Sequence, residues 1–104
     1  MKISFIVPSY NNLRYLKNAY HSIRTWEEDG QEIVILDDAS VDGTAEWLDS
    51  LNDPNLIVWK NETGKRLGHT ITYDIGVNLS TNDIFSIFHA DMFVGENYAK
   101  NLVK

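Results

Sequence analysis

The stretch Glu32-Ile33-Val34-Ile35-Leu36-Asp37-Asp38 is the part of the sequence that decides the fold. Its unbroken run of branched apolar residues is typical of a strand that is buried on both faces of a sheet. The run leads directly into two carboxylates, so the predicted strand ends in a pair of acidic side chains. A strand of this kind needs neighbouring strands and covering helices, and the sequence on either side supplies candidates for both.

Similar apolar runs lie before and after this stretch. The other predicted strands are residues 3–7, which Pro8 closes, residues 56–59 and residues 84–88. Between the strands, apolar residues recur at helical spacing. The helical positions are Leu13, Leu16, Tyr20 and Ile23, then Ala45, Leu48 and Leu51, and then Ile71, Ile75 and Leu79. This alternation predicts βαβ units, and therefore an α/β fold with a mostly parallel sheet flanked by helices.

Polar residues mark the expected starts of these helices. Asn11 or Asn12 is placed to cap the first helix and Asp42 to cap the second. Short side chains that carry an oxygen accept hydrogen bonds from the first free N–H groups of a helix. A further helix is expected to begin near Glu96. At this length, residues 1–104 are expected to form one domain.

The composition limits the classes of partner. The chain has 9 Lys and Arg against 15 Asp and Glu, which gives a net charge of −6. Basic residues that are scattered and outnumbered argue against nucleic acid and against an anionic membrane surface. The absence of cysteine excludes disulfides and thiolate zinc sites. The sequence shows neither a signal peptide nor an apolar run of membrane-spanning length, so we expect a soluble, cytoplasmic protein.

The carboxyl ends of the predicted strands should carry the chemistry, because open parallel sheets bind their ligands at that edge. The residues expected there are Ser9, Tyr10 and Asn11 after the first strand, Asp37 and Asp38 after the second, Asn61 and the loop 64–68 after the third, and His89 and Asp91 after the fourth. A tyrosine ring can stack on a base, and a carboxylate can accept hydrogen bonds from a base edge or a ribose. Lys65 and Arg66 can add charge near a pyrophosphate, although such residues are more often surface charges. Together these groups suit a nucleoside diphosphate.

The sequence lacks the glycine-rich motifs that cradle phosphates with backbone N–H groups. The phosphates would then be neutralised in another way, and a metal held by carboxylates is the obvious candidate. Mg²⁺ or Mn²⁺ is expected, since both prefer oxygen ligands and bridge carboxylates to substrate phosphates. Asp91 is the proposed ligand. We also interpret the acidic pair Asp37-Asp38 as a sign of a ligand or metal, because adjacent carboxylates repel each other.

Three blocks of the sequence resemble the ordered signatures of family 2 glycosyltransferases. The blocks are Ile6-Val7-Pro8-Ser9-Tyr10-Asn11, Leu36-Asp37-Asp38-Ala39-Ser40-Val41-Asp42-Gly43-Thr44 and His89-Ala90-Asp91. The resemblance covers essentially the whole chain, and the middle block is its most specific part. It implies a Rossmann-like GT-A fold that binds a nucleotide-diphospho-sugar donor. It also implies transfer of the sugar to an acceptor, whether glycan, lipid or protein.

The resemblance also implies roles for individual residues. Pro8 and Tyr10 would line the base pocket, with the Tyr10 ring stacking on the base. Asp38 would bind the base, and Asp37 would support that loop.

The block His89-Ala90-Asp91 occupies the place of the family's Asp-x-Asp motif, so Asp91 would be the metal ligand. His89 replaces the first Asp of the motif, which usually approaches the ribose. A neutral imidazole in that place can still donate or accept one hydrogen bond.

The chain departs from the family at its carboxyl end. It stops at Lys104, whereas family members continue into an acceptor-binding half that carries the catalytic base of inverting enzymes. No carboxylate of this sequence matches that base, so no catalytic residue is assigned. We therefore expect a truncated donor domain, which is a fragment, a minimal binding module, or a part that another chain completes. A half-sheet with an exposed edge also predicts self-association or a covering element.

The expected function is that of a metal-dependent glycosyltransferase donor domain. The alternative is a non-catalytic nucleotide-sugar-binding or interaction module, and turnover of a donor would separate the two. A nucleotidyltransferase on a similar sheet is disfavoured, because its glycine- and basic-rich loop is absent after Val7. Trp26, Trp47 and Trp59 are expected to be core or interface anchors rather than sugar platforms.

Overall fold

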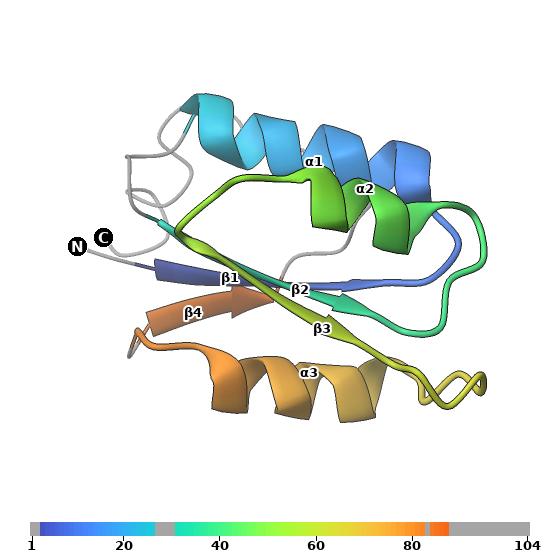
Figure 1. Cartoon of the computed structure of the whole chain (residues 1–104). Coiled ribbons are helices and arrows are strands. Elements are labelled where there is room, and N and C mark those ends of the chain that lie inside the picture. Colours follow the sequence, from blue (N-terminus) through green and yellow to red (C-terminus); the bar gives the residue numbers. More distant parts are fainter. Residues whose placement is uncertain (1–2, 27–30, 83, 88–104) are drawn as a thin grey trace.

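Four parallel strands form the centre of the structure, a computed structural model that describes residues 3–26, 31–82 and 84–87 (Figure 1). The strands are β1 (Ile3–Ser9), β2 (Glu32–Asp37), β3 (Leu56–Lys60) and β4 (Ile84–Ile87), and they lie in the order β3-β2-β1-β4. Helices α1 (Leu13–Trp26) and α2 (Thr44–Ser50) cover one face of the sheet, and α3 (His69–Leu79) covers the other. The predicted α/β fold with a parallel sheet flanked by helices is confirmed.

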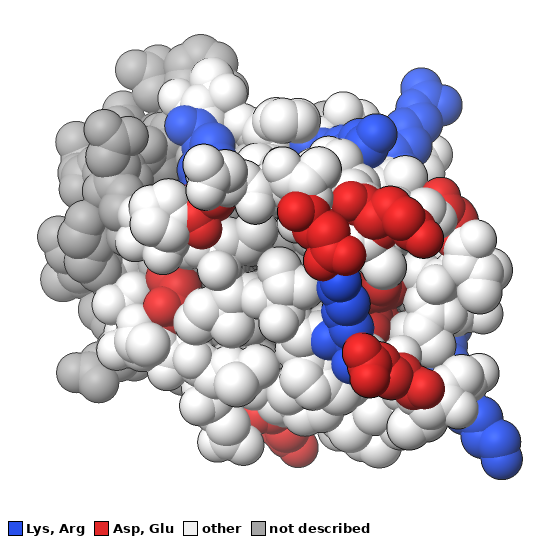
Figure 2. Space-filling model, in the orientation of Figure 1, with Lys and Arg blue, Asp and Glu red and all other residues white. Residues whose placement is uncertain are grey.

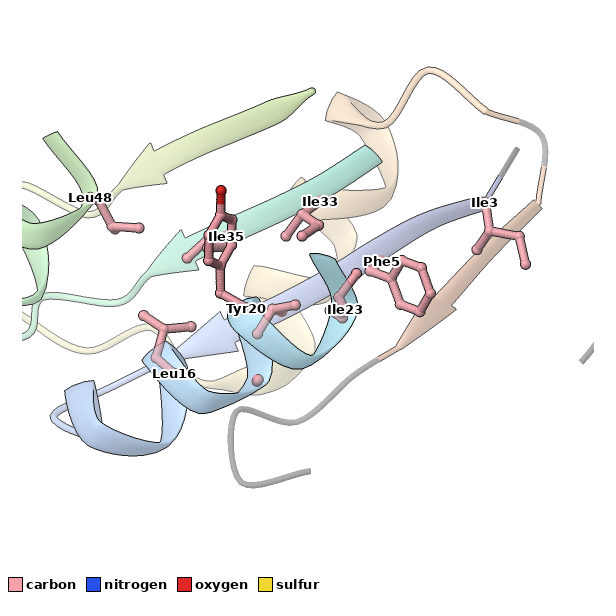
Figure 3. Close-up of a cluster of buried hydrophobic side chains, with 10 residues drawn as sticks. Ile3, Phe5, Leu16, Tyr20, Ile23, Ile33, Ile35 and Leu48 are labelled. Carbon is pink, nitrogen blue, oxygen red and sulfur yellow. The ribbon is translucent and has the colours of Figure 1, made fainter. Parts of the chain in front are cut away.

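The core has two layers because side chains alternate between the two faces of each strand. Toward α1 and α2, Phe5 and Ile35 are fully buried and pack in one cluster with Leu16 (Figure 3). Toward α3, Ile6 and Leu36 form the centre of a second cluster. Every residue of β2 is buried, as its continuous apolar run predicted.

The first strand is longer than the sequence predicted. Pro8 does not close β1, which continues to Ser9. In the described residues, the pairing of β1 with β4 extends only from Ile3 to Ile6, while Ser9 O still accepts a hydrogen bond from Asp38 N on the β2 side. On the β2 side the hydrogen bond at this end of β1 is made by Ser9 rather than by Pro8, so the missing N–H of Pro8 removes none of the bonds to β2.

The third helix buries a different face from the one that the sequence predicted. Ile71 and Leu79 of the expected apolar stripe are exposed, and Ile75 alone of the three packs against the sheet. Among the residues of α3 whose burial is described, Thr72 and Gly76 are buried.

The close approach of α3 to the sheet explains this change of face. A Cβ atom at Gly76 would lie 2.5 Å from Ile6 Cγ2 and 2.9 Å from Leu36 Cδ1. The absent side chain of Gly76 thus lets the helix backbone lie directly on the second cluster. The spacing of large apolar residues cannot predict a contact that depends on a glycine.

The start of α1 is stabilised from another loop rather than by a local asparagine side chain. Leu13 N donates to Asp42 Oδ2 at 3.0 Å. Asn12 contributes its backbone carbonyl, which accepts from Leu16 N at 2.9 Å. Asn12 thus occupies the N-cap position, as the sequence predicted, but the side chain that accepts from the start of the helix is that of Asp42, far away in the sequence.

The start of α2 also differs from the prediction by one residue. Gly43 rather than Asp42 occupies the N-cap position, and it makes no side-chain cap bond. Asp42 Oδ1 nevertheless accepts from Thr44 N at 3.3 Å and from Thr44 Oγ1 at 2.6 Å. The helix ends at Ser50, so Leu51 follows it, although Leu51 still packs on the first cluster.

Polar contacts tie the elements together near the amino ends of β1 and β2. The buried Glu32 carboxylate accepts from Ser4 Oγ at 2.8 Å, from Thr81 N at 2.8 Å and from Thr81 Oγ1 at 2.7 Å. Arg24 and Asp53 form an ion pair at 2.7 Å. These contacts join β1, β2 and the residues that follow α3, and they link α1 to the turn before β3.

Two of the three predicted aromatic anchors are confirmed as core residues. Trp47 packs against the first cluster and Trp59 against the second. The side chain of Trp26, the residue Phe88 and the helix expected from Glu96 lie outside the described part of the structure. Over the described ranges, none of the helices combines the length and the apolar character needed to cross a bilayer.

Candidate functional site

The carboxyl ends of three strands meet at one edge of the sheet. The register pairs Ser9 of β1 with Asp37 of β2, and Asp37 with Lys60 of β3. The loops that follow these strands, residues 10–12, 38–43 and 61–68, therefore emerge side by side on the right of Figure 1. We call these three loops the carboxyl rim.

The first two loops of the carboxyl rim are locked together by hydrogen bonds. Asn11 N donates to Ser40 Oγ at 2.9 Å, and Asn11 Oδ1 accepts from Val41 N at 2.8 Å. Ser40 N donates in turn to Asp37 Oδ1 at 3.1 Å. Asn11 and Ala39 have φ angles of 49° and 66°, in the left-handed region that side chains disfavour. The reciprocal hydrogen bonds hold both residues in these conformations, a kind of strain that gathers at functional sites.

A single carboxylate joins the starts of two helices at this rim. Asp42 accepts from Leu13 N of α1 through one oxygen, and from the N–H and hydroxyl of Thr44 of α2 through the other. Burial disfavours the charged form of Asp42, but the hydrogen bonds from Thr44 and Leu13 outweigh it and lower the pKa of this carboxyl. A negative charge is favourable here, because the N-terminal ends of both helices carry partial positive charge.

The two members of the acidic pair are buried, and each holds a different loop. Asp37 accepts from a backbone N–H of the second loop, as described above. Asp38 is 2% exposed and reaches the third loop. It accepts from Asn61 Nδ2 at 2.8 Å, from Leu67 N at 2.9 Å and from Gly68 N at 2.8 Å.

These donors keep Asp38 ionised. Burial disfavours its charged form, but the hydrogen bonds from Leu67 N, Asn61 and Gly68 N, together with the nearby charge of Arg66, lower the pKa of the Asp38 carboxyl. The interpretation of the acidic pair as a sign of an external ligand or metal stays a prediction. The charge of Asp38 is compensated within the chain, so repulsion between the two carboxylates requires no ligand or metal.

Asn61 organises the third loop through its side-chain amide. Its Nδ2 donates to Asp38 Oδ1 at 2.8 Å and to Lys65 O at 2.6 Å. Its Oδ1 accepts from Thr63 N at 3.0 Å and from Thr63 Oγ1 at 2.7 Å. Both N–H groups and both lone pairs of the amide are therefore used.

Arg66 connects the third loop to the first. Its guanidinium Cζ lies 4.4 Å from the centroid of the Tyr10 ring, a cation–π arrangement. Its Nε lies 3.9 Å from Asp38 Oδ2. Tyr10 is 37% exposed and the Arg66 side chain 47% exposed, so solvent reaches both groups.

The structure brings most of the predicted site residues together. Those at the ends of the strands and in the carboxyl rim are Ser9, Tyr10, Asn11, Asp37, Asp38 and Arg66. Pro8 lies in the buried strand that leads to them. His89, Ala90 and Asp91 lie outside the described residues. In the part of the chain that is described, no group of three or more His, Asp or Glu side chains is arranged to hold a metal ion.

Three residues hold the rim in shape, a role that the sequence predicted for none of them. Ser40 and Asp42 bind the first loop to the second, and Asn61 folds the third. Ser40 and Asp42 lie in the middle motif block, so a signal for them was present. The signal for Asn61 is its position, directly after a strand and before a loop that contains two glycines.

Charged side chains of both signs are interspersed on the face shown in Figure 2, between larger uncharged areas. The ion pairs of the described residues include that of Lys60 in β3 with Asp49 in α2. The face in Figure 2 therefore lacks the continuous stripe of positive charge that binds the phosphate backbone of nucleic acid.

The architecture that carries this rim is that of a known class of enzymes. The structure matches the crystal structure of S. aureus TarS 1-349 with a TM-score of 0.85 and 25% sequence identity, over 98% of this chain and 31% of the TarS 1-349 chain. It also matches the mannosyltransferase PcManGT from Pyrobaculum calidifontis, in complex with GDP-Man and Mn²⁺, with a TM-score of 0.81 and 25% identity. That match covers 97% of this chain and 31% of PcManGT. The fold is therefore the GT-A fold of glycosyltransferases.

Sequence matches to known proteins identify the family of the chain. Residues 4–104 match the family described as Glycosyl transferase family 2. The chain is 35% identical over 94 residues to abequosyltransferase RfbV of Salmonella typhimurium, which covers 88% of this chain and 28% of RfbV. The chain belongs to glycosyl transferase family 2. It spans 28% of the length of this curated relative and 31% of the TarS 1-349 chain.

Proposed function

We propose that residues 1–104 form the donor domain of a glycosyltransferase, which binds a nucleotide-diphospho-sugar so that its sugar is transferred to an acceptor. The observation that carries this proposal is the cluster of Tyr10, Arg66 and Asp38 at the carboxyl rim of a family 2 chain. The structural relatives support it, since TarS has been solved in complex with UDP-GlcNAc and PcManGT with GDP-Man.

Each member of this cluster has a chemical part in the proposal. The exposed ring of Tyr10 provides a surface on which a base stacks. Arg66 provides N–H donors and a positive charge for the diphosphate. Asp38 is ionised, almost fully buried and already accepts three N–H groups, so we assign it the part of holding the third loop, which carries Arg66, against the sheet. Asp37 and Asn11 hold the loops on which these groups lie.

We further propose that a divalent metal, Mg²⁺ or Mn²⁺, accompanies the donor. Asp38 already accepts three N–H groups, so among the acidic residues of the proposed site Asp91 is the one we assign to the metal, with His89 and Ala90 beside it. One carboxylate is a sufficient protein contribution, because Mg²⁺ usually keeps waters and substrate phosphates as its other ligands. When bound, the metal would neutralise the negative charge of the diphosphate. The Mn²⁺ in the PcManGT complex supports this choice.

Calorimetry tests the donor and the metal together. We expect one of UDP-, GDP- and dTDP-sugars to bind in the presence of Mn²⁺, and removal of the metal with EDTA to weaken that binding. Asp91→Ala should abolish the metal dependence. Glu46→Ala removes an equal charge from the exposed surface of α2 and should behave as wild type. The proposal fails if none of these nucleotide sugars binds, and the metal assignment fails if Asp91→Ala leaves metal-dependent binding intact.

Turnover is measured separately from binding. Release of the nucleoside diphosphate from bound donor, followed by chromatography, would show that the domain supports transfer or hydrolysis. Binding without release would identify a binding module.

The stacking role of Tyr10 has its own test. Tyr10→Ala should weaken nucleotide binding by about tenfold, because a base stacked on an aromatic ring contributes about 1–3 kcal/mol. Tyr15→Ala removes another exposed ring, on the surface of α1, and serves as the control. Equal affinities of the two variants would exclude the stacking role.

A further inference from the structure

The third loop of the carboxyl rim is fastened to the sheet at one carboxylate. It runs from β3 to α3 as residues 61–68. Leu67 N and Gly68 N at its far end and Asn61 Nδ2 at its near end all donate to Asp38. The two ends of the loop are thereby held together on a side chain of β2's carboxyl end.

The residue that this arrangement fixes is Arg66. On one side of it, Lys65 O accepts from Asn61 Nδ2 at 2.6 Å. On the other side, Leu67 N donates to Asp38 Oδ1 at 2.9 Å. With both neighbouring peptide groups bound, the backbone at Arg66 is fixed and its guanidinium lies over Tyr10.

Neither the backbone preferences of its residues nor apolar burial keeps the loop 61–68 in this conformation. Gly64 and Gly68 have φ angles of 79° and 92°, and glycine adopts many other conformations at no steric cost. Residues 62–67 are exposed, so apolar burial does not order them. The order of the loop therefore depends on its hydrogen bonds, and Asn61 takes part in four of these through its amide.

We propose that Asn61 is a positioning residue for donor binding, which holds the loop 61–68 so that Arg66 stays over Tyr10. This inference rests on the proposed function of the carboxyl rim. A loop that is already ordered does not lose conformational entropy when the ligand binds, so it raises affinity without touching the ligand. Asn61 acts in this way through Arg66.

The isosteric substitution Asn61→Asp tests this role. This substitution replaces Nδ2, which donates to Asp38 Oδ1 at 2.8 Å and to Lys65 O at 2.6 Å, by a carboxylate oxygen. Both hydrogen bonds are lost, and the new carboxylate repels Asp38 and the carbonyl of Lys65. Because the lost hydrogen bond to the Asp38 carboxylate is one to a charged group, we expect the affinity for the nucleotide sugar to be about tenfold weaker. Asn78→Asp makes the same change of charge on the exposed surface of α3 and should bind as wild type.

A double-mutant cycle separates positioning from a general effect on structure. In an Arg66→Ala background, Asn61→Asp should weaken binding by less than about twofold. Asn61 acts on binding by positioning the Arg66 side chain, and that side chain is already absent. Equal losses in both backgrounds would overturn the inference.

A second variant guards against a misfolded protein. Thr63→Val removes the hydroxyl that donates to Asn61 Oδ1 at 2.7 Å without adding a charge. It should weaken binding in the same direction but by less than Asn61→Asp. Full affinity in Thr63→Val together with full affinity in Asn61→Asp would overturn the inference.

An NMR measurement tests Asn61 without any nucleotide. In wild type, the side-chain resonances of Arg66 should show the upfield ring-current shift of a group that lies over Tyr10, and the amides of Leu67 and Gly68 should exchange slowly. Asn61→Asp should remove both signatures. If wild type binds no nucleotide sugar, the proposed function fails, while this measurement still decides the role of Asn61. Unchanged Arg66 shifts in Asn61→Asp would overturn that role.

Discussion

At the scale of single residues, the carboxyl rim consists of side chains that bind the backbone of a neighbouring loop. Asp38 accepts the N–H groups of Leu67 and Gly68, and Asp42 accepts that of Leu13. Each of these bonds joins residues about thirty positions apart, so the loops cannot move independently. Rigid loops of this kind hold functional groups in place before a ligand arrives.

Asp42 should matter for stability as well as for the shape of the rim. Asp42→Ala removes the acceptor for the first N–H groups of both α1 and α2, so we expect a loss of about 1–2 kcal/mol in the free energy of unfolding in urea. Asp42→Asn keeps one acceptor oxygen and should lose less.

The control for Asp42 is another aspartate of the same part of the chain. Asp49 of α2 is exposed and pairs with Lys60, and exposed ion pairs contribute little. Asp49→Ala should therefore leave the free energy of unfolding nearly unchanged. An equal effect of Asp42→Ala and Asp49→Ala would show that Asp42 does not stabilise the helix starts.

The positions of the site residues were predictable, but their contacts were not. Tyr10 and Asp38 follow strands, and the carboxyl ends of parallel strands must share one edge of the sheet. The hydrogen bond of Asn61 to Asp38, in contrast, depends on the backbone conformation of the whole third loop. Neither residue type nor spacing specifies that conformation, so the role of Asn61 could not be predicted.

At the scale of secondary structure elements, strands were predicted better than helix faces. A strand buried on both sides reads as an unbroken apolar run, and β2 has this pattern. The face that a helix buries depends on what it meets. α3 lies so close to the sheet that only a glycine fits where Gly76 meets Ile6 and Leu36, while the larger Ile71 faces solvent. Periodicity of large apolar residues therefore predicted the helix but not its orientation.

Gly76 gives a prediction whose sign distinguishes packing from helix propensity. Ala is favoured over Gly in a helix by about 1 kcal/mol, so propensity alone predicts that Gly76→Ala stabilises the protein. The added Cβ would lie 2.5 Å from Ile6 Cγ2, however, and both Ile6 and Leu36 are fully buried. We therefore expect a net destabilisation of about 1–3 kcal/mol in urea unfolding, which is typical of an overpacked core.

An exposed position of the same helix provides the comparison. Asn78→Ala adds helix propensity without meeting the sheet, so it should be neutral or slightly stabilising. A Gly76→Ala variant that is more stable than wild type would show that α3 does not lie as close to the sheet as described.

At the scale of the whole molecule, β3 is an outer strand of the sheet and its five residues are only partly buried. Exposed strand edges pair readily with other chains, and Ile71 and Leu79 add exposed apolar surface on α3. We expect the chain to self-associate at micromolar concentration, which light scattering measures as a mass above the 11.9 kDa of one chain. A mass of 11.9 kDa at every concentration would contradict this expectation.

The response of the whole fold to acid follows from four carboxylates that tie its elements together. Burial opposes the charged forms of Glu32, Asp38, Asp42 and Asp53, but their hydrogen bonds outweigh burial and lower all four pKa values. A carboxyl group whose pKa is lower in the folded state contributes stability that is fully present above the pKa of the unfolded chain. That contribution is lost as the pH falls through the lowered values.

Urea unfolding at a series of pH values measures this effect. The free energy of unfolding should stay level from neutral pH to about pH 5 and then fall steadily toward about pH 2, because the unfolded chain binds protons at each of these carboxyl groups before the folded chain does. Glu32→Gln removes one of the four groups, so it should lower stability at pH 7 and make the decline with acid shallower. Glu46→Gln neutralises an exposed carboxyl on α2 and should keep the wild-type slope. A decline in Glu32→Gln as steep as that of wild type would mean that the contacts of Glu32 with Ser4 and Thr81 do not stabilise its charged form.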